Sequence, residues 1–265
     1  HRPVPPPHGL QANRRKLCAG GGVVIKHITI IATAAILFLP IARAEEHNIL
    51  QALEELALLT EREVGSDGPA VVKWMKQIYV AEYFVPKTVH SVVSNSMIEA
   101  KSINGINIRY KMNNANLIII GIDVLGDDAY KSYRNVMSTI IADERVLHKF
   151  LSTKWHVGEH CKLHMSGGRA IPVSIDGVVI IINLASETSE QMYCAANSIA
   201  SSLGLLSGWI SKNKHSIFTV KTTRPPFLQE DDISALRILY DKRMVTGINR
   251  SEALKIARTI VVESK

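Results

Sequence analysis

Apolar residues recur with two different periods along the chain, and these periods predict its helices and strands. A helical period is found in six segments, residues 46–63, 88–103, 127–151, 186–204, 228–240 and 250–263. Strand-forming residues dominate four other segments, residues 71–84, 106–112, 116–122 and 164–184. Within them, Leu117–Ile120 is a continuous apolar run, which is typical of a strand buried on both faces. The order of the elements predicts a single α/β domain with a mixed, twisted sheet flanked by helices.

Turn residues and charges mark several of the predicted ends. The segment 164–184 carries turn signals at Gly167-Gly168 and Asp176-Gly177, and its predicted core strand is Val178–Ile182. Asp127-Asp128 and Asp231-Asp232 open two of the helices. Because the helix macrodipole favours anions in the first turn, we interpret both pairs as helix N-termini and not as paired catalytic carboxylates.

The positive charge of the chain is concentrated at its beginning. The net charge is +7, with 31 cations and 24 anions. Six of the cations and none of the anions lie within residues 1–44, which leaves 25 cations and 24 anions in the rest of the chain. A near-neutral domain lacks the electrostatic footprint of a nucleic-acid-binding protein, so we expect no nucleic-acid partner.

The end of this basic segment has the features of a secretory signal peptide, which we assign to residues 25–44. Lys26 precedes an uncharged apolar stretch, Ile28–Ala42, and Ala42-Arg43-Ala44 is a small-x-small cleavage site. The stretch is shorter than the roughly 20 residues that span a bilayer. We therefore expect a periplasmic or secreted protein that begins at Glu45 and keeps no stable membrane span. An uncleaved anchor is the alternative interpretation.

Composition and cysteine content indicate how the remaining segments of the chain are organised. Residues 1–24 are rich in Pro and Gly without periodicity, which indicates an over-extended gene start or a disordered tail. Residues 45–69 hold the first predicted helix and a linker, and residues 70–265 hold the domain. The exported part contains two cysteines, Cys161 and Cys194, which most simply form one disulfide. Two buried thiols, or one thiol in an intermolecular bridge, are the alternatives.

Residues 194–204 resemble the active-site helix of the metzincin zinc peptidases, His-Glu-x-x-His-x-x-Gly-x-x-His, when Gly204 is set on the glycine of that motif. The three His positions then fall on Asn197, Ser201 and Ser207, and the Glu position falls on Ser198. A catalytic zinc needs three deprotonated ligands and a carboxylate that acts on the bound water. Asn and Ser supply neither, so the resemblance implies a vestigial cleft without a competent zinc site.

Two later segments extend this resemblance. His215-Ser216-Ile217-Phe218 stands where metzincins have the Met-turn, with Phe218 in place of the methionine, and we include Phe218 in the vestigial cleft. Residues 228–240, with Asp231-Asp232-Ile233 and Leu239-Tyr240, resemble the last helix of matrixins.

The chain is more closely similar to the bacterial family "domain of unknown function 2927", over about residues 70–265. The similarity rests on Lys73-Trp74, on a Cys before Leu203-Gly204-Leu205, on the Ser-x-Phe turn, on Leu239–Arg243 and on Gly247–Leu254. It implies an exported domain of metzincin-like (zincin-like) architecture. Other members often keep acidic residues where this chain has Asn197 and Ser198, so the resemblance does not carry catalysis over to this chain.

Three histidines, His156, His160 and His164, are spaced by four residues and would share one side of a helix, where they could hold zinc. Gly158 and the strand that follows argue against a helix there. One interpretation is that a loop places two of these histidines on a metal ion, with His215 as a further ligand. The other interpretation is a solvated polar loop.

Ser198, Ser201 and Ser202 lie outside any Gly-x-Ser-x-Gly motif, so we interpret them as a polar helix face. The sequence thus favours a non-catalytic binding or envelope-associated module without a cofactor, whose partner is an unknown protein or envelope ligand. A metal-dependent, peptidase-like hydrolase with a non-standard site is the alternative, and a purely structural partner in an envelope complex is a third class.

Overall fold

The computed structural model describes residues 48–58, 68, 70–167, 174–205, 216–218 and 227–264. The chain divides between Arg43 and Ala44, and all of the described residues belong to the second part. The expected signal peptide and the predicted site residues Ser207 and His215 lie outside the described residues. Within the described part, no helix is both long enough and apolar enough to cross a lipid bilayer.

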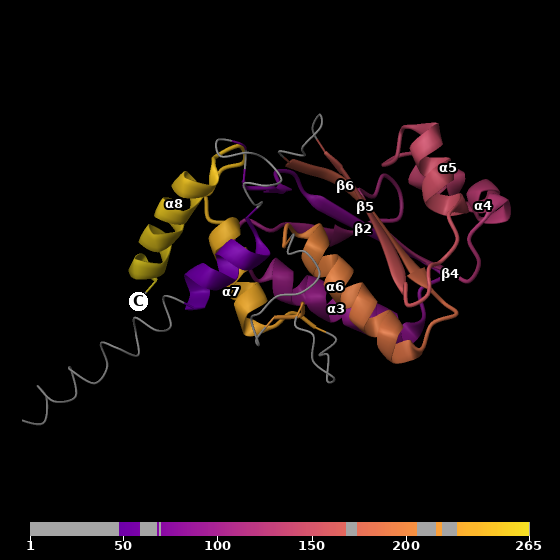
Figure 1. Cartoon of the computed structure of the whole chain (residues 1–265), viewed down its shortest axis with the longest axis horizontal. Coiled ribbons are helices and arrows are strands. Elements are labelled where there is room, and N and C mark those ends of the chain that lie inside the picture. Colours follow the sequence, from indigo (N-terminus) through magenta and orange to yellow (C-terminus); the bar gives the residue numbers. More distant parts are fainter. Residues whose placement is uncertain are drawn as a thin grey trace, which may run out of the picture. The chain divides into compact units, whose positions relative to one another are not determined.

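A six-stranded mixed sheet forms the centre of the domain (Figure 1). Its strands are β1 (Lys73–Trp74), β2 (Ile78–Tyr83), β3 (Ile108–Tyr110), β4 (Leu117–Ile122), β5 (Cys161–Gly167) and β6 (Ser174–Asn183). The hydrogen-bonded order is β1-β6-β4-β2-β3, and all of these pairs are parallel. β5 pairs with β6 in the antiparallel sense. The predicted mixed α/β domain is therefore confirmed.

Helices cover both faces of the sheet. α3 (Lys87–Lys101) and α6 (Thr188–Ser202) lie on one face, where α7 (Glu230–Leu239), α8 (Arg250–Glu263) and a helix over residues 48–56 extend the same hydrophobic core. α4 (Asp127–Met137) and α5 (Glu144–Ser152) pack on the other face. The central strand β4 is buried along its whole length. Leu117 and Ile119 contribute to one core, and Ile118 and Ile120 contribute to the other, as the two-residue period of a strand requires.

Three predicted elements differ from the structure. The helix predicted over residues 127–151 is two helices, because the Asp143 carboxylate caps α5 by accepting from the backbone N–H groups of Arg145 and Val146. The strand predicted over residues 71–84 is two strands with different neighbours. β1 pairs with β6, whereas β2 pairs with both β3 and β4. The helix predicted over residues 46–63 ends at residue 56, and Leu58 forms an antiparallel bridge with Val71. Asp176-Gly177 lies inside β6 and is not a turn.

Several residues that carry the family resemblance form one buried structural cluster. The Trp74 indole donates to the carbonyl of Ser202 (2.6 Å), and the Tyr240 hydroxyl donates to the carbonyl of Leu203 (2.9 Å). Trp74 also donates its backbone N–H to the Tyr240 hydroxyl (3.3 Å). Gly204, at φ +104°, packs directly on the carbonyl of Val72. These contacts connect β1 to the ends of α6 and α7. The residues shared with the family at these positions therefore stabilise the fold.

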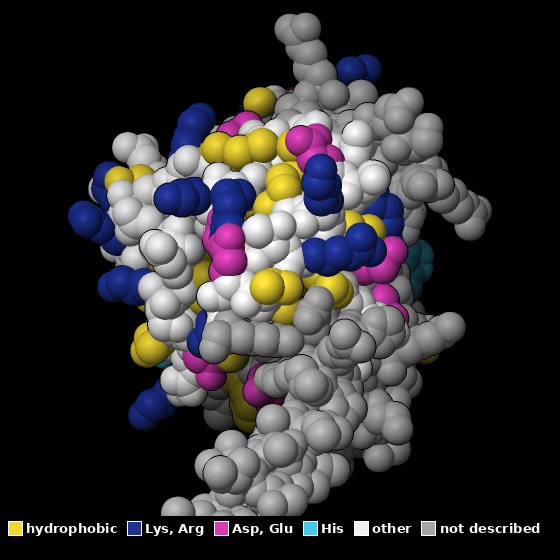
Figure 2. Space-filling model, turned by 90° about the vertical axis from the view of Figure 1, so that its left-hand side faces the viewer, with side chains coloured by type: hydrophobic (Ala, Val, Ile, Leu, Met, Phe, Trp, Pro, Cys, Tyr) yellow, Lys and Arg dark blue, Asp and Glu magenta, His cyan; other side chains and the backbone are white. Residues whose placement is uncertain are grey.

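The face that carries α8 shows cations and anions interspersed (Figure 2). The exposed side chains of α8 include Lys255 and Arg258 together with Glu252 and Glu263. A surface of mixed sign on this helix agrees with the near-neutral charge of the chain after residue 44.

Candidate functional site

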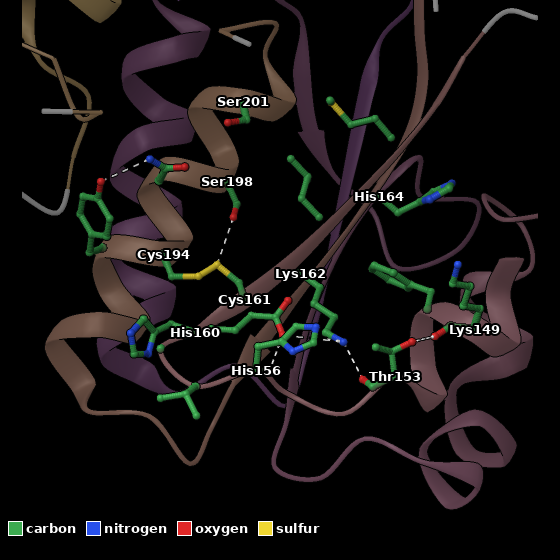
Figure 3. Close-up of a pocket in the computed structure, with 18 of the residues that line it drawn as sticks. Lys149, Thr153, His156, His160, Cys161, Lys162, His164, Cys194, Ser198 and Ser201 are labelled. Carbon is green, nitrogen blue, oxygen red and sulfur yellow. Dashed lines mark hydrogen bonds and ion pairs between the residues drawn. A yellow bond between two sulfur atoms is a disulfide. The ribbon is translucent and has the colours of Figure 1, made fainter. Parts of the chain in front are cut away.

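An open cleft of about 1020 Å³ runs along β5, between α5 and α6 (Figure 3). Side chains of β5 alternate between its two walls. Cys161, Leu163 and Met165 face α6 and the larger core, whereas Lys162 and His164 face α5. Strand β5 therefore separates two flanks of the cleft that have different chemistry.

The predicted disulfide between Cys161 and Cys194 is present, with Cα atoms 6.0 Å apart. It joins the start of β5 to the middle of α6, and both cysteines line the cleft. The hydroxyl of Ser198 donates to the sulfur of Cys161 (3.2 Å). The disulfide thus fixes the distance between β5 and the α6 wall of the cleft.

Three positions of α6 and one position of a turn, all predicted for a vestigial cleft, line the cleft. Asn197, Ser198, Ser201 and Phe218 all line the cleft. Ser198 is buried, and the amide of Asn197 donates to the Tyr193 hydroxyl at 3.5 Å. The α6 wall offers amide and hydroxyl groups, which form hydrogen bonds but are poor ligands for a catalytic zinc ion.

A buried carboxylate holds the turn that contains Phe218. Asp232 in α7 accepts from the Ser216 hydroxyl (2.6 Å) and from the backbone N–H groups of Ile217 (2.8 Å) and Gln229 (2.8 Å). Burial raises the pKa of Asp232 to about 6, against the opposite effect of these hydrogen bonds. Asp232 is thus a helix N-terminal residue, as expected, and also the anchor of the turn.

The three histidines of the four-residue spacing all line the cleft, but they belong to different environments. His156 lies in the loop after α5, and His160 immediately precedes β5. Both ring nitrogens of His160 have partners, since Nδ1 is 2.9 Å from the Ser186 hydroxyl and Nε2 is 3.6 Å from a Glu190 carboxylate oxygen. His164 lies in β5. Nowhere in the described ranges do three His, Cys, Asp or Glu side chains come together as a potential metal site.

The α5 wall was not predicted from the sequence. It consists of Val146, Lys149, Phe150 and Thr153, together with His164 of β5. The helical period of residues 127–151 indicates which side of the helix is apolar, but it does not show which strand that side covers. Lys162 strengthens this wall, because its ammonium group donates to the carbonyl of Thr153 (2.6 Å).

Comparisons with known proteins place the chain in a family without assigning it an activity. No curated protein matches the chain significantly. A family model matches residues 46–259, which include every described strand, the cleft and the disulfide. The chain therefore belongs to the family described as "Protein of unknown function (DUF2927)".

Proposed function

We propose that the domain is an exported, non-catalytic binding module whose cleft holds an extended polypeptide segment as an additional strand beside β5. The observation that carries this proposal is the second edge of β5, which no other described strand covers. Among the strands that the structure describes, β5 pairs with β6 alone. An unpaired edge presents a row of backbone N–H and C=O groups that a further strand can bind.

The register of β5 identifies the groups at this edge. Asn183 donates its backbone N–H to the carbonyl of His160 (2.9 Å). Because alternate residues of an antiparallel strand bond to the same neighbour, Lys162 and His164 also direct their backbone groups to β6. Cys161, Leu163 and Met165 therefore direct theirs away from β6, along the edge of a strand that lines the cleft.

The two walls supply contacts for the side chains of such a segment. Side chains of a bound strand would point alternately toward α5 and toward α6. On the α6 side they meet the polar groups of Asn197, Ser198 and Ser201. Backbone hydrogen bonds along β5 would give affinity, and the walls would give specificity.

The chemistry of α6 supports binding over zinc-dependent hydrolysis. The positions that correspond to the zinc ligands and the carboxylate of a metzincin carry an amide and hydroxyls, of which Asn197, Ser198 and Ser201 lie in the cleft. A metzincin-like ancestry with a retained cleft and lost ligands accounts for both observations. Export through the segment 25–44 completes the proposal, and N-terminal sequencing of the exported protein should begin at Glu45.

The test of strand addition uses a displayed library of random ten-residue peptides with blocked termini. We expect the domain to enrich peptides that it binds and does not cleave. Leu163→Pro removes one N–H from the free edge of β5 and leaves the bonds to β6 in place. It should weaken binding at least about tenfold, whereas Leu163→Ala, which keeps the N–H, should weaken binding less.

Circular dichroism must show that both variants are folded. The proposal is overturned if no peptide is enriched, or if folded Leu163→Pro binds the enriched peptides as tightly as Leu163→Ala does.

A further inference from the structure

The α5 wall of the cleft carries a cation that has no counter-ion among the described residues. Lys149 is exposed on α5 and lines the cleft. It makes no ion pair with any residue in the described part of the chain. In Figure 3, Lys149 and His164 lie on the same side of β5, opposite Ser198 and Ser201. This flank is therefore positively charged, and the α6 flank is polar and uncharged.

Glu159, the one acidic residue among the described residues that line the cleft, does not offset Lys149. The Glu159 carboxylate accepts from the backbone N–H of His156 (2.9 Å) and lies 3.9 Å from the Lys162 ammonium. Lys162 in turn donates to the carbonyl of Thr153. Since these groups satisfy one another, the charge of Lys149 remains available to a bound segment.

His164 adds a hydrogen-bond donor beside this cation. Its ring is half-buried and lies 5.7 Å from the ring of Phe150. Burial lowers the pKa of His164 below its ordinary value of 6.5, so the imidazole is neutral at pH 7 and one ring nitrogen carries a proton to donate. A carboxylate placed next to this ring would raise its pKa again.

A strand added to β5 would place every second side chain on this flank. The residue opposite His164 shares its face of the sheet, so its stem would pack on Phe150 and its end group would come to Lys149. We infer that Lys149, His164 and Phe150 form a subsite for an acidic side chain, and hence that the module takes an acidic extended peptide. This inference rests on the proposed strand addition.

The first test is the composition of the enriched peptides. We expect Asp or Glu at one fixed position. Residue preferences at the neighbouring positions should alternate, because successive side chains point toward α5 and toward α6 in turn. One enriched peptide, acetylated and amidated, is then compared with its Glu→Gln version, and we expect the Gln version to bind at least about tenfold more weakly. A Gln version with a free C-terminus shows whether a terminal carboxylate supplies the same group.

The second test reverses the charge of the wall. Lys149→Glu should abolish the preference for Glu over Gln, while the Gln peptide should keep its affinity within about twofold. The matched control is Lys154→Glu, because Lys154 is exposed five residues later and does not line the cleft. It should retain the preference within about twofold.

A third measurement reports on the subsite directly. In an NMR titration, the pKa of His164 should rise when the Glu peptide is bound and should rise less with the Gln peptide. If Leu163→Pro abolishes binding but neither Lys149→Glu nor the Glu→Gln change affects it, strand addition stands and the acidic subsite is wrong. If no peptide binds, both proposals fail.

Discussion

One carboxylate holds the turn that brings Phe218 to the cleft. Asp232 is fully buried, and its two oxygens accept three hydrogen bonds, of which two come from the turn that carries Phe218. Burying a charge is costly unless hydrogen bonds compensate for it. Burial raises the pKa of Asp232 more than these hydrogen bonds lower it, so they compensate only in part for the lost hydration of the carboxylate.

Asp232→Asn should stabilise the domain near neutral pH. The amide oxygen can accept from both backbone N–H groups, and the amide nitrogen can donate to Ser216. Because the folded-state pKa is about 6 and the ordinary value is 3.8, the native state of the natural protein binds the extra proton between these values. Its stability therefore falls as pH rises through this window, by roughly 2–3 kcal/mol from this group.

Urea unfolding at pH 4 and pH 7 measures this effect. The difference in unfolding free energy between Asp232→Asn and the natural protein should shift in favour of the variant as pH rises. Asp232→Ala serves as the contrast, because it leaves three donors without an acceptor and should cost about 3 kcal/mol or more. An Asn variant that is equally destabilised at both pH values would contradict this account.

Gly204 is required by both conformation and space. Its φ is +104°, and a Cβ would lie 2.6 Å from the backbone oxygen of Val72. Gly204→Ala should therefore cost about 2–4 kcal/mol. Gly158 has φ +79° with nothing within 4 Å of a Cβ, so Gly158→Ala should cost only about 1 kcal/mol. Chemical denaturation compares the two, and equal losses would mean that the contact with Val72 is unimportant.

At the scale of elements, the cleft consists of two helices held on either side of one strand. The disulfide between Cys161 and Cys194 links β5 to α6 across 33 residues of sequence. Removing it by the double change Cys161→Ala and Cys194→Ala should cost about 3–4 kcal/mol by the chain-entropy estimate.

The check on the disulfide is mass spectrometry after alkylation, followed by denaturation of the double variant. We expect alkylation of Cys161 and Cys194 only after reduction. Alkylation of both cysteines in non-reduced, denatured protein would show that the bond does not form.

The sequence predicts where most helices and strands lie, but it does not predict where one long segment is split into two elements. The limits of α3 and α8 follow from apolar period, whereas the break at residues 138–143 depends on the cap that Asp143 makes to α5. Asn197 and Ser201 could be assigned to the cleft by their resemblance to a motif. Lys149 could not, because its role depends on α5 packing beside β5, and no local pattern encodes that contact.

At the scale of the whole molecule, the residues of the buried junction and the residues of the proposed binding cleft lie in different parts of the family pattern. Trp74, Tyr240 and Gly204 form the buried junction of β1, α6 and α7, far along the chain from the loop that leads into β5. The cleft combines a strand edge that no other described strand pairs with, a disulfide and two unlike walls. Such a cleft needs no metal ion to hold an extended segment, because a strand edge binds through backbone groups.

The most direct test of strand addition is amide hydrogen exchange along β5, measured by NMR with and without an enriched peptide. Without peptide, the amides of Lys162 and His164 should be protected because they bond to β6, and those of Leu163 and Met165 should exchange fast. Bound peptide should slow exchange at Leu163 and Met165 at least about tenfold and leave the other two little changed. Saturating peptide that leaves Leu163 and Met165 exchanging at their free rates would contradict the account.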